Sequence, residues 1–178
     1  MNDFKIIISG PVGAGKTTAI GAISDIEPVT TDEQATDMTK AQKPGTTVAM
    51  DYGQITLDKS EKIHLYGTPG QERFNFMWDI LTQGGIGLVL LLNNTRPDPF
   101  RDMHFFLDAF QAFIASSKVV IGVTQMDLSR TPTIEDYHLQ LENTGTKIPI
   151  FDVDAREKRD VSLLVEALLY SLDPGLGG

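Results

Sequence analysis

The chain has 178 residues, of which 41% are hydrophobic and 22% charged, and its formal net charge is −9. This length fits one domain with its own hydrophobic core, here spanning 1–178. The negative charge argues against general nucleic-acid binding, because phosphates would be repelled. Having no cysteine, the chain lacks disulfides, thiolate metal sites and cysteine-linked lipid anchors. No apolar run is long enough to cross a bilayer. We therefore expect a cytoplasmic domain that only a partner could recruit to a membrane complex.

The strongest motif is Gly-Pro-Val-Gly-Ala-Gly-Lys-Thr at 10–17. It matches the phosphate-binding loop template, a glycine, four residues, and then Gly-Lys followed by Ser or Thr. An apolar strand over 4–9 and a helix over 15–24 are predicted on either side. We expect Lys16 to reach the β- and γ-phosphates and the Thr17 hydroxyl to ligate Mg²⁺. The nucleotide-binding residues predicted in this segment are Gly13, Ala14, Gly15, Lys16, Thr17 and Thr18.

Hydrophobic periodicity divides the rest of the chain into alternating strands and helices. Residues 25–46 predict a long loop, and the apolar phase shift at Gly53 predicts a bulge or bend. The final helix is predicted to be capped by Asp160. Further strands are predicted at 48–57, 62–66, 86–92, 118–124 and 148–153, and further helices at 100–114, 133–141 and 161–172. The fold class is therefore α/β, with a six-stranded, mostly parallel sheet, one antiparallel edge strand and helices on both faces.

Polar segments follow several of these strands, at the edge of the sheet where α/β proteins bind ligands. They are Gly-Thr-Pro-Gly-Gln-Glu-Arg-Phe at 67–74, Thr-Gln-Met-Asp at 124–127 and Asp-Ala-Arg at 154–156, while Thr46 and Thr47 precede the second strand. Because the carboxyl ends of parallel strands meet at one edge, we expect these segments to form one site with the phosphate-binding loop.

Together the segments resemble the nucleotide-binding segments of Ras-like small GTPases, over nearly the whole chain. Thr-Thr-Val-Ala-Met-Asp-Tyr-Gly at 46–53, with the 67–74 segment, is most similar to bacterial small GTPases of the MglA-like, Roadblock-associated group. The resemblance implies a P-loop NTPase with a Ras-like G-domain fold, GTP and GDP as ligands, and Mg²⁺ as cofactor. It also implies a Roadblock-type GTPase-activating or effector partner. It leaves the oligomeric state open.

By position, the resemblance implies that Thr47 ligates Mg²⁺ when a γ-phosphate is present and that Gln71 orients the attacking water. Asp127 would accept from guanine N1–H and N2–H₂; adenine has an acceptor at N1 and no amine at C2. The implied catalytic residues are Gln71, Lys16 and Thr47, the metal ligands Thr17 and Thr47, and the other nucleotide contacts Gly70, Gln125, Ala155 and Arg156. Switch segments are expected at about 30–48 and 68–83, ordered by GTP and released by its hydrolysis.

The chain departs from the small-GTPase pattern at Gly67, where that pattern has an aspartate near Mg²⁺. Asp51 is either its substitute or a structural residue of its strand. Val12 could crowd an arginine arriving from a partner. The catalytic arginine, worth about 10³–10⁵ in rate, is also unassigned. In cis the candidates are Arg73, Arg96 and Arg101, each with a structural role as the alternative. We therefore expect slow hydrolysis without a partner.

Two other functions stay open on the sequence. One is a nucleotide-binding scaffold with little or no hydrolysis. The other is a P-loop kinase for a small metabolite, which the lack of an Arg-rich lid segment disfavours.

Overall fold

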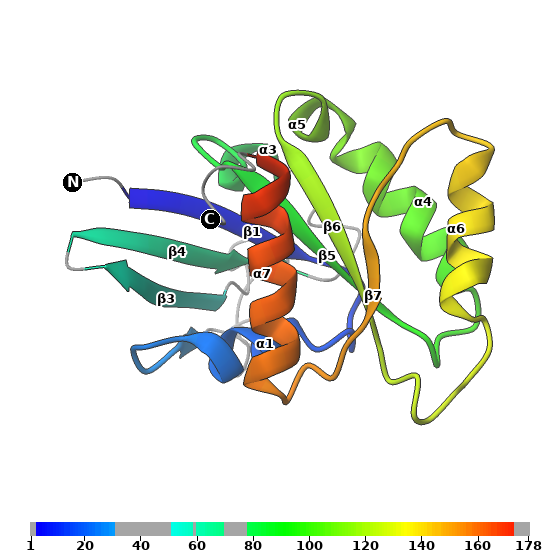
Figure 1. The fold of residues 1–178 in the computed structure, drawn as a ribbon, viewed down its shortest axis with the longest axis horizontal. Helices are drawn as coiled ribbons and strands as arrows, with labels where there is room; N and C mark the ends of the chain where they lie inside the picture. The colour runs from blue at the N-terminus through cyan, green and yellow to red at the C-terminus, as the bar shows by residue number, and fades with distance from the viewer. Residues whose placement is uncertain (1–2, 31–50, 59, 70–77, 173–178) are drawn as a thin grey trace, which may run out of the picture.

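The computed structural model describes residues 3–30, 51–58, 60–69 and 78–172 (Figure 1). The strands are β1 (Asp3–Ser9), β2 (Val29–Thr30), β3 (Asp51–Asp58), β4 (Glu61–Gly67), β5 (Gly87–Asn93), β6 (Lys118–Thr124) and β7 (Ile150–Asp152). The helices are α1 (Lys16–Ile23), α3 (Trp78–Leu81), α4 (Pro99–Ala109), α5 (Gln111–Ala115), α6 (Ile134–Glu142) and α7 (Lys158–Leu172). Within these parts of the chain, no helix combines the length and apolar character needed to cross a membrane.

The strands form one sheet in the order β2-β3-β4-β1-β5-β6-β7. All neighbouring pairs from β4 to β7 are parallel, whereas β3 is antiparallel to β4 and to β2. The predicted α/β sheet, mostly parallel with one antiparallel strand, is confirmed. The two-residue strand β2 lies outside β3, so the antiparallel strand is second from the edge.

Helices cover both faces of the sheet, because the strands direct apolar side chains to both faces. In Figure 1, α7 lies in front of the sheet, and α1 packs beside α7 on the same face. The core on that face joins Ile6, Ile8, Ile20, Leu164 and Leu168. The core on the other face joins Ile7, Leu88, Leu90, Met103, Phe106 and Tyr137. Every residue of β5 is buried, as expected for an interior parallel strand that is covered on both faces.

The structure differs from the predicted elements in local detail. The single helix predicted over 100–114 is two helices, α4 and α5, and the break at Phe110 coincides with the stacking of that ring on Trp78. The bulge predicted at Gly53 is wrong: pairing is regular there, and the irregularity lies between Thr56 and Asp58. Gly53 instead allows α1 to pack closely, because a Cβ at that position would lie 2.6 Å from Ile20 Cγ2.

The end of the chain differs as well. Strand β7 is shorter than predicted, and α7 begins at Lys158. Asp160 is therefore in the first turn of α7 and not at its cap, and its carboxylate accepts a 2.8 Å hydrogen bond from the Asp154 N–H. This contact ties the β7–α7 connection, which carries the predicted segment 154–156, to the start of α7.

Candidate nucleotide-binding site

The phosphate-binding loop connects β1 to α1, and its glycines are required by its shape. Gly10 has φ +147°, and a Cβ there would lie 2.1 Å from the Leu91 carbonyl oxygen. Gly15 is the N-cap of α1 in the left-handed conformation, with φ +97°, and a Cβ there would lie 2.9 Å from Ala155 Cβ. A larger residue at either position would be strained and would push the loop away from its neighbour, which is β5 at Gly10 and the β7–α7 connection at Gly15.

Side chains at the ends of β5 and β6 hold this loop by its carbonyl groups. The Gly13 carbonyl accepts hydrogen bonds from Asn93 Nδ2 at 3.1 Å and from Gln125 Nε2 at 2.8 Å. The Ala14 carbonyl accepts one from Thr124 Oγ1 at 2.9 Å. Because N–H and C=O of a trans peptide point in opposite directions, the Gly15 N–H points away from Thr124. The sheet therefore orients the loop amides that a phosphate would contact.

Lys16 places its positive charge within the loop. Its Nζ donates hydrogen bonds of 2.8 Å to the carbonyls of Gly10 and Pro11, and the residue is only 9% exposed. A buried ammonium surrounded by loop carbonyls is suited to an anion that enters the same loop, because its charge is little screened by water.

A cavity of about 770 Å³ lies beside the loop, between the carboxyl ends of β6 and β7. This volume is within the usual range of small-molecule sites. Its lining includes most of the predicted nucleotide contacts, namely Ala14, Gly15, Thr18, Gln125, Asp127, Ala155 and Arg156. The exposed Asp127 provides a carboxylate at the cavity, and the buried Ala155 packs against the loop at Gly15.

Arg156 is paired with Asp154 at the rim of this cavity. Its Nε and Nη2 donate to the two carboxylate oxygens at 2.9 and 2.8 Å. These hydrogen bonds, together with one that the Arg156 backbone N–H donates to the same carboxylate at 2.9 Å, lower the pKa of Asp154 from 3.8 to about 2, and the side-chain contact raises the pKa of Arg156. The pair keeps the guanidinium beside the cavity, where its plane is available to a base or ribose.

The sequence analysis missed two asparagines, Asn93 at the end of β5 and Asn94 directly after it. Asn93 contacts Gly13, as described above. Asn94, only 2% exposed, donates to the carbonyls of Ser129 and Pro132 at 2.7 and 2.9 Å and accepts from the Tyr137 hydroxyl at 2.6 Å. These contacts hold the 125–133 segment that carries Asp127. The signal in the sequence is the sudden polar pair after a wholly apolar strand.

Oxygen atoms beside the loop fit a magnesium ion. Thr17 Oγ1 donates a 2.5 Å hydrogen bond to Asp51 Oδ2, and Asp51 Oδ1 is buried without a hydrogen-bond partner in the described part of the chain. A hydroxyl and a carboxylate are donors that Mg²⁺ prefers, and in nucleotide sites it takes its remaining ligands from phosphates and water. Thr17 and Asp51 are thus the described residues that would hold it, and the ion would neutralise phosphate charge.

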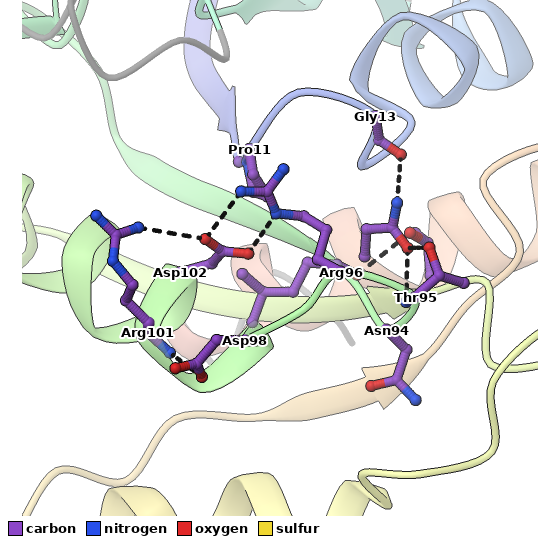
Figure 2. A network of polar contacts seen from close by, with 12 residues as sticks. Pro11, Gly13, Asn94, Thr95, Arg96, Asp98, Arg101 and Asp102 are labelled. Atoms are coloured by element: carbon purple, nitrogen blue, oxygen red, sulfur yellow. Dashed lines mark hydrogen bonds and ion pairs between the residues drawn. The ribbon is translucent and has the colours of Figure 1, made fainter.

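Several predicted residues lie outside the described residues: Thr47, Gly70, Gln71 and Arg73, with most of the switch segment 30–48 and residues 70–77 of the other switch. Two arginine candidates are described. Figure 2 shows Arg96 and Arg101 directed toward Asp102. Arg96 Nε lies 2.5 Å from the buried Asp102 carboxylate, and Arg101 Nη1 lies 3.8 Å from it. Both contacts favour structural roles for these arginines.

Comparisons with known proteins also indicate nucleotide binding. Residues 25–171 match a family model described as a conserved hypothetical ATP binding protein. An uncharacterized protein of Methanocaldococcus jannaschii is 35% identical over 139 residues, covering 77% of this chain and 79% of the relative. The Ras-related protein RabC of Dictyostelium discoideum is 24% identical over 178 residues, covering 96% and 84%. The GTP-binding protein YPT1 of Saccharomyces cerevisiae is 23% identical over 164 residues, covering 89% and 73%. The predicted MglA-like group is not among these relatives and stays a prediction.

Proposed function

Because the chain belongs to the family of conserved hypothetical ATP-binding proteins, we propose that it binds a nucleotide and that its nucleotide is guanine-based. One observation carries the choice of base: the Asp127 carboxylate lines the cavity beside the phosphate-binding loop. A carboxylate only accepts hydrogen bonds, so it matches the two donors of guanine and not the N1 acceptor of adenine. The similarity to Ras-related and GTP-binding proteins supports the same choice.

The family description names ATP, so the base is the first point to test. We expect wild type to bind GDP and GTP at least tenfold more tightly than ADP and ATP in calorimetric titrations. Asp127→Asn should weaken GTP and admit xanthosine triphosphate, because the amide can donate to the carbonyl that replaces the guanine amine. Asp152→Asn, which removes a charge from the same cavity without that predicted contact, is the matched control. Equal binding of ATP and GTP by wild type would overturn the guanine proposal.

We propose further that GTP is hydrolysed by in-line attack of water. Lys16 and the loop amides would stabilise charge that develops on the phosphates, and Gln71 would orient the water. Gln71→Leu should then slow single-turnover hydrolysis while leaving GTP affinity nearly intact. An unchanged rate would remove Gln71 from the mechanism, and phosphate transfer to an acceptor other than water would support a kinase instead.

The biological output we propose is a molecular switch. The γ-phosphate would be sensed by Thr47 and Gly70, so segments 30–48 and 68–83 would exchange amide hydrogen more slowly with a GTP analogue than with GDP. Because Arg96 and Arg101 are paired with Asp102, a Roadblock-type partner is the proposed accelerator of hydrolysis. Identical exchange in both nucleotide states would favour a scaffold, and fast turnover by the isolated protein would remove the need for a partner.

A further inference from the structure

We propose that Asn94, directly after β5, is a positioning residue for base recognition and gives the site its preference for purines that have an amine at C2. This inference rests on the proposed guanine-nucleotide function and names the residue that fixes the position of Asp127. Asn94 is not among the residues that line the cavity. Its effect on a bound base would therefore act through the backbone of the 125–132 segment.

The first observation is the turn that carries Asp127. The backbone N–H groups of Leu128 and Ser129 both donate to the Gln125 carbonyl, at 3.1 and 3.2 Å, so Asp127 lies in the middle of a tight turn. The chain before Asp127 continues directly from β6, whereas residues 128–132 belong to no strand or helix. The position of the Asp127 carboxylate thus depends on what holds the second half of the turn.

The second observation is that Asn94 holds this second half. Its Nδ2 donates to the carbonyl of Ser129 at 2.7 Å and to the carbonyl of Pro132 at 2.9 Å. Its own backbone N–H donates to the Thr124 carbonyl at 3.0 Å, and the residue is only 2% exposed. One buried residue therefore contacts the chain on both sides of Asp127 and fixes the turn relative to the sheet.

The third observation is that the position requires an amide. The nitrogen of the Asn94 side chain faces two carbonyl oxygens, which can only accept, and its oxygen accepts from the Tyr137 hydroxyl at 2.6 Å. Asparagine has two donor protons and an acceptor in one planar group, so it satisfies all three contacts. Both amide protons are used within the protein, which favours a positioning role for Asn94 over direct contact with a ligand.

The amine at C2 is the part of guanine that is most sensitive to this positioning. Asp127 would accept from N1–H and from the C2 amine with its two oxygens, and such a paired contact requires both oxygens to be in place. A displaced turn would lengthen or misalign one of the two hydrogen bonds, and hydrogen bonds weaken steeply with poor geometry. Hypoxanthine retains N1–H but lacks the amine. The ratio of the affinities for GDP and inosine diphosphate (IDP) therefore measures the second hydrogen bond.

The test is calorimetric titration of the full chain with GDP and with IDP. Wild type should bind GDP roughly 10–100-fold more tightly, as expected for one hydrogen bond to a charged acceptor. Asn94→Ala should lower this ratio by about 3–10-fold, because the Asp127 turn loses its support. A wild-type ratio in Asn94→Ala, together with a lower unfolding temperature, would overturn the proposal.

Val119→Ala is the control for stability. Val119 is buried in β6 near its start, at the end of that strand opposite Asp127. The change should lower the unfolding temperature through lost packing and leave the ratio of GDP to IDP affinity as in wild type. An equal fall of the ratio in both variants would show that general destabilisation, and not the Asn94 contacts, controls base discrimination.

A second measurement uses wild type, in case Asn94→Ala does not fold. Coupling between two sites is reciprocal, so a C2 amine whose binding depends on the Asn94 hydrogen bonds must also stabilise those bonds. The side-chain amide protons of Asn94 should therefore exchange with solvent more slowly in the GDP complex than in the IDP complex, as measured by NMR. Equal exchange in the two complexes would overturn the proposal.

The outcomes separate this inference from the proposed function. A wild type that binds no nucleotide, or binds ADP as tightly as GDP, would overturn the proposed function and this inference with it. A wild type that prefers GDP over ADP but not over IDP would overturn only the inference. The same holds if wild type prefers GDP over both and Asn94→Ala keeps both preferences, since Asn94 would then contribute to stability alone.

Discussion

The Gln125 side chain donates a 2.8 Å hydrogen bond to the carbonyl of Gly13, a residue 112 positions earlier. This bond joins the segment that carries Asp127 to the phosphate-binding loop. Gln125 also has a left-handed backbone, with φ +62°, which is uncommon for a residue with a side chain and is maintained only by its surroundings. The Gln125–Gly13 contact therefore connects the part of the proposed site that would bind the base to the part that would bind the phosphates.

Gln125→Ala should weaken both ends of the site together. Loss of one partly exposed hydrogen bond corresponds to about 0.5–1.5 kcal/mol, or roughly 2–12-fold in affinity. We expect this loss for GDP and GTP alike, with the preference for guanine unchanged, as measured by calorimetry. Gln111→Ala, an exposed glutamine at the start of α5, is the control. A weakened GTP affinity with unchanged GDP affinity would contradict this view of Gln125.

Tyr137 and Asn94 give a prediction on stability. Burial raises the pKa of Tyr137, so its hydroxyl keeps the proton that it donates to Asn94 Oδ1. Tyr137→Phe retains the ring but leaves this buried oxygen without its partner, which costs about 1–3 kcal/mol. The free energy of unfolding in urea should fall by that amount, whereas Tyr170→Phe, on an exposed tyrosine, should change it by less than about 0.5 kcal/mol. Equal effects of the two changes would contradict a stabilising role for the Asn94 network.

Much of the fold was predictable because its signals are local. The phosphate-binding loop is set by glycine spacing, and the buried strand 86–92 was predicted within one residue of β5 (Gly87–Asn93) because a run apolar on both faces has few other uses. Strand β2 was not predictable, since its two residues form a strand only by pairing with Asp51 and Tyr52. The break between α4 and α5 lies at Phe110, whose ring stacks on Trp78, a contact that the periodicity of the sequence does not contain.

The candidate site likewise has residues that were predictable from the sequence and residues that were not. The segments of the cavity were predictable, because parallel strands must bring their carboxyl ends to one edge. The roles of Asn93 and Asn94 were not, because each bonds to backbone groups far away in the sequence. The contact between Asp51 and Thr17 was also hidden, since it depends on where β3 lies beside α1. These contacts depend on how strands far apart in the sequence pair in the sheet, and the spacing of residues along the sequence does not predict that pairing.

Gly10→Ala should prevent stable folding of the loop against β5. The new Cβ would lie 2.1 Å from a backbone oxygen, and neither group can move without displacing a strand. Gly84→Ala is the matched control, because Gly84 also has a positive φ, +78°, but has open space where a Cβ would be. We expect Gly84→Ala to cost about 1–2 kcal/mol in backbone strain. Gly10→Ala should lower the stability of the fold much more, and thermal unfolding measures both effects. Similar unfolding temperatures would show that the loop can shift away from Leu91.

The ion pair between Asp154 and Arg156 predicts a pH dependence at the rim of the cavity. The pKa of Asp154 in the folded protein, about 2, is below its ordinary value of 3.8. A depressed carboxyl pKa contributes stability that is fully present above the ordinary value and is lost as pH falls from about 4 toward 2. The difference in unfolding free energy between wild type and Arg156→Ala should therefore be constant above about pH 5 and should shrink below pH 4. The effect should be modest and salt-dependent, because both side chains are accessible to water.

The direct measurement is the ¹³C titration of the Asp154 carboxyl. Arg156→Ala removes the two side-chain hydrogen bonds to the Asp154 carboxylate but keeps the one from the residue 156 backbone N–H, so the pKa of Asp154 should rise part of the way toward 3.8. Lys158→Ala removes a cation that has no described contact with Asp154, so it should leave the pKa of Asp154 unchanged. If Arg156 also contacts the base, GDP should dissociate faster from Arg156→Ala at neutral pH, where the pair is fully charged. A normal Asp154 titration in wild type would show that the pair does not persist in solution, and Arg156 would then be free to move away from the cavity.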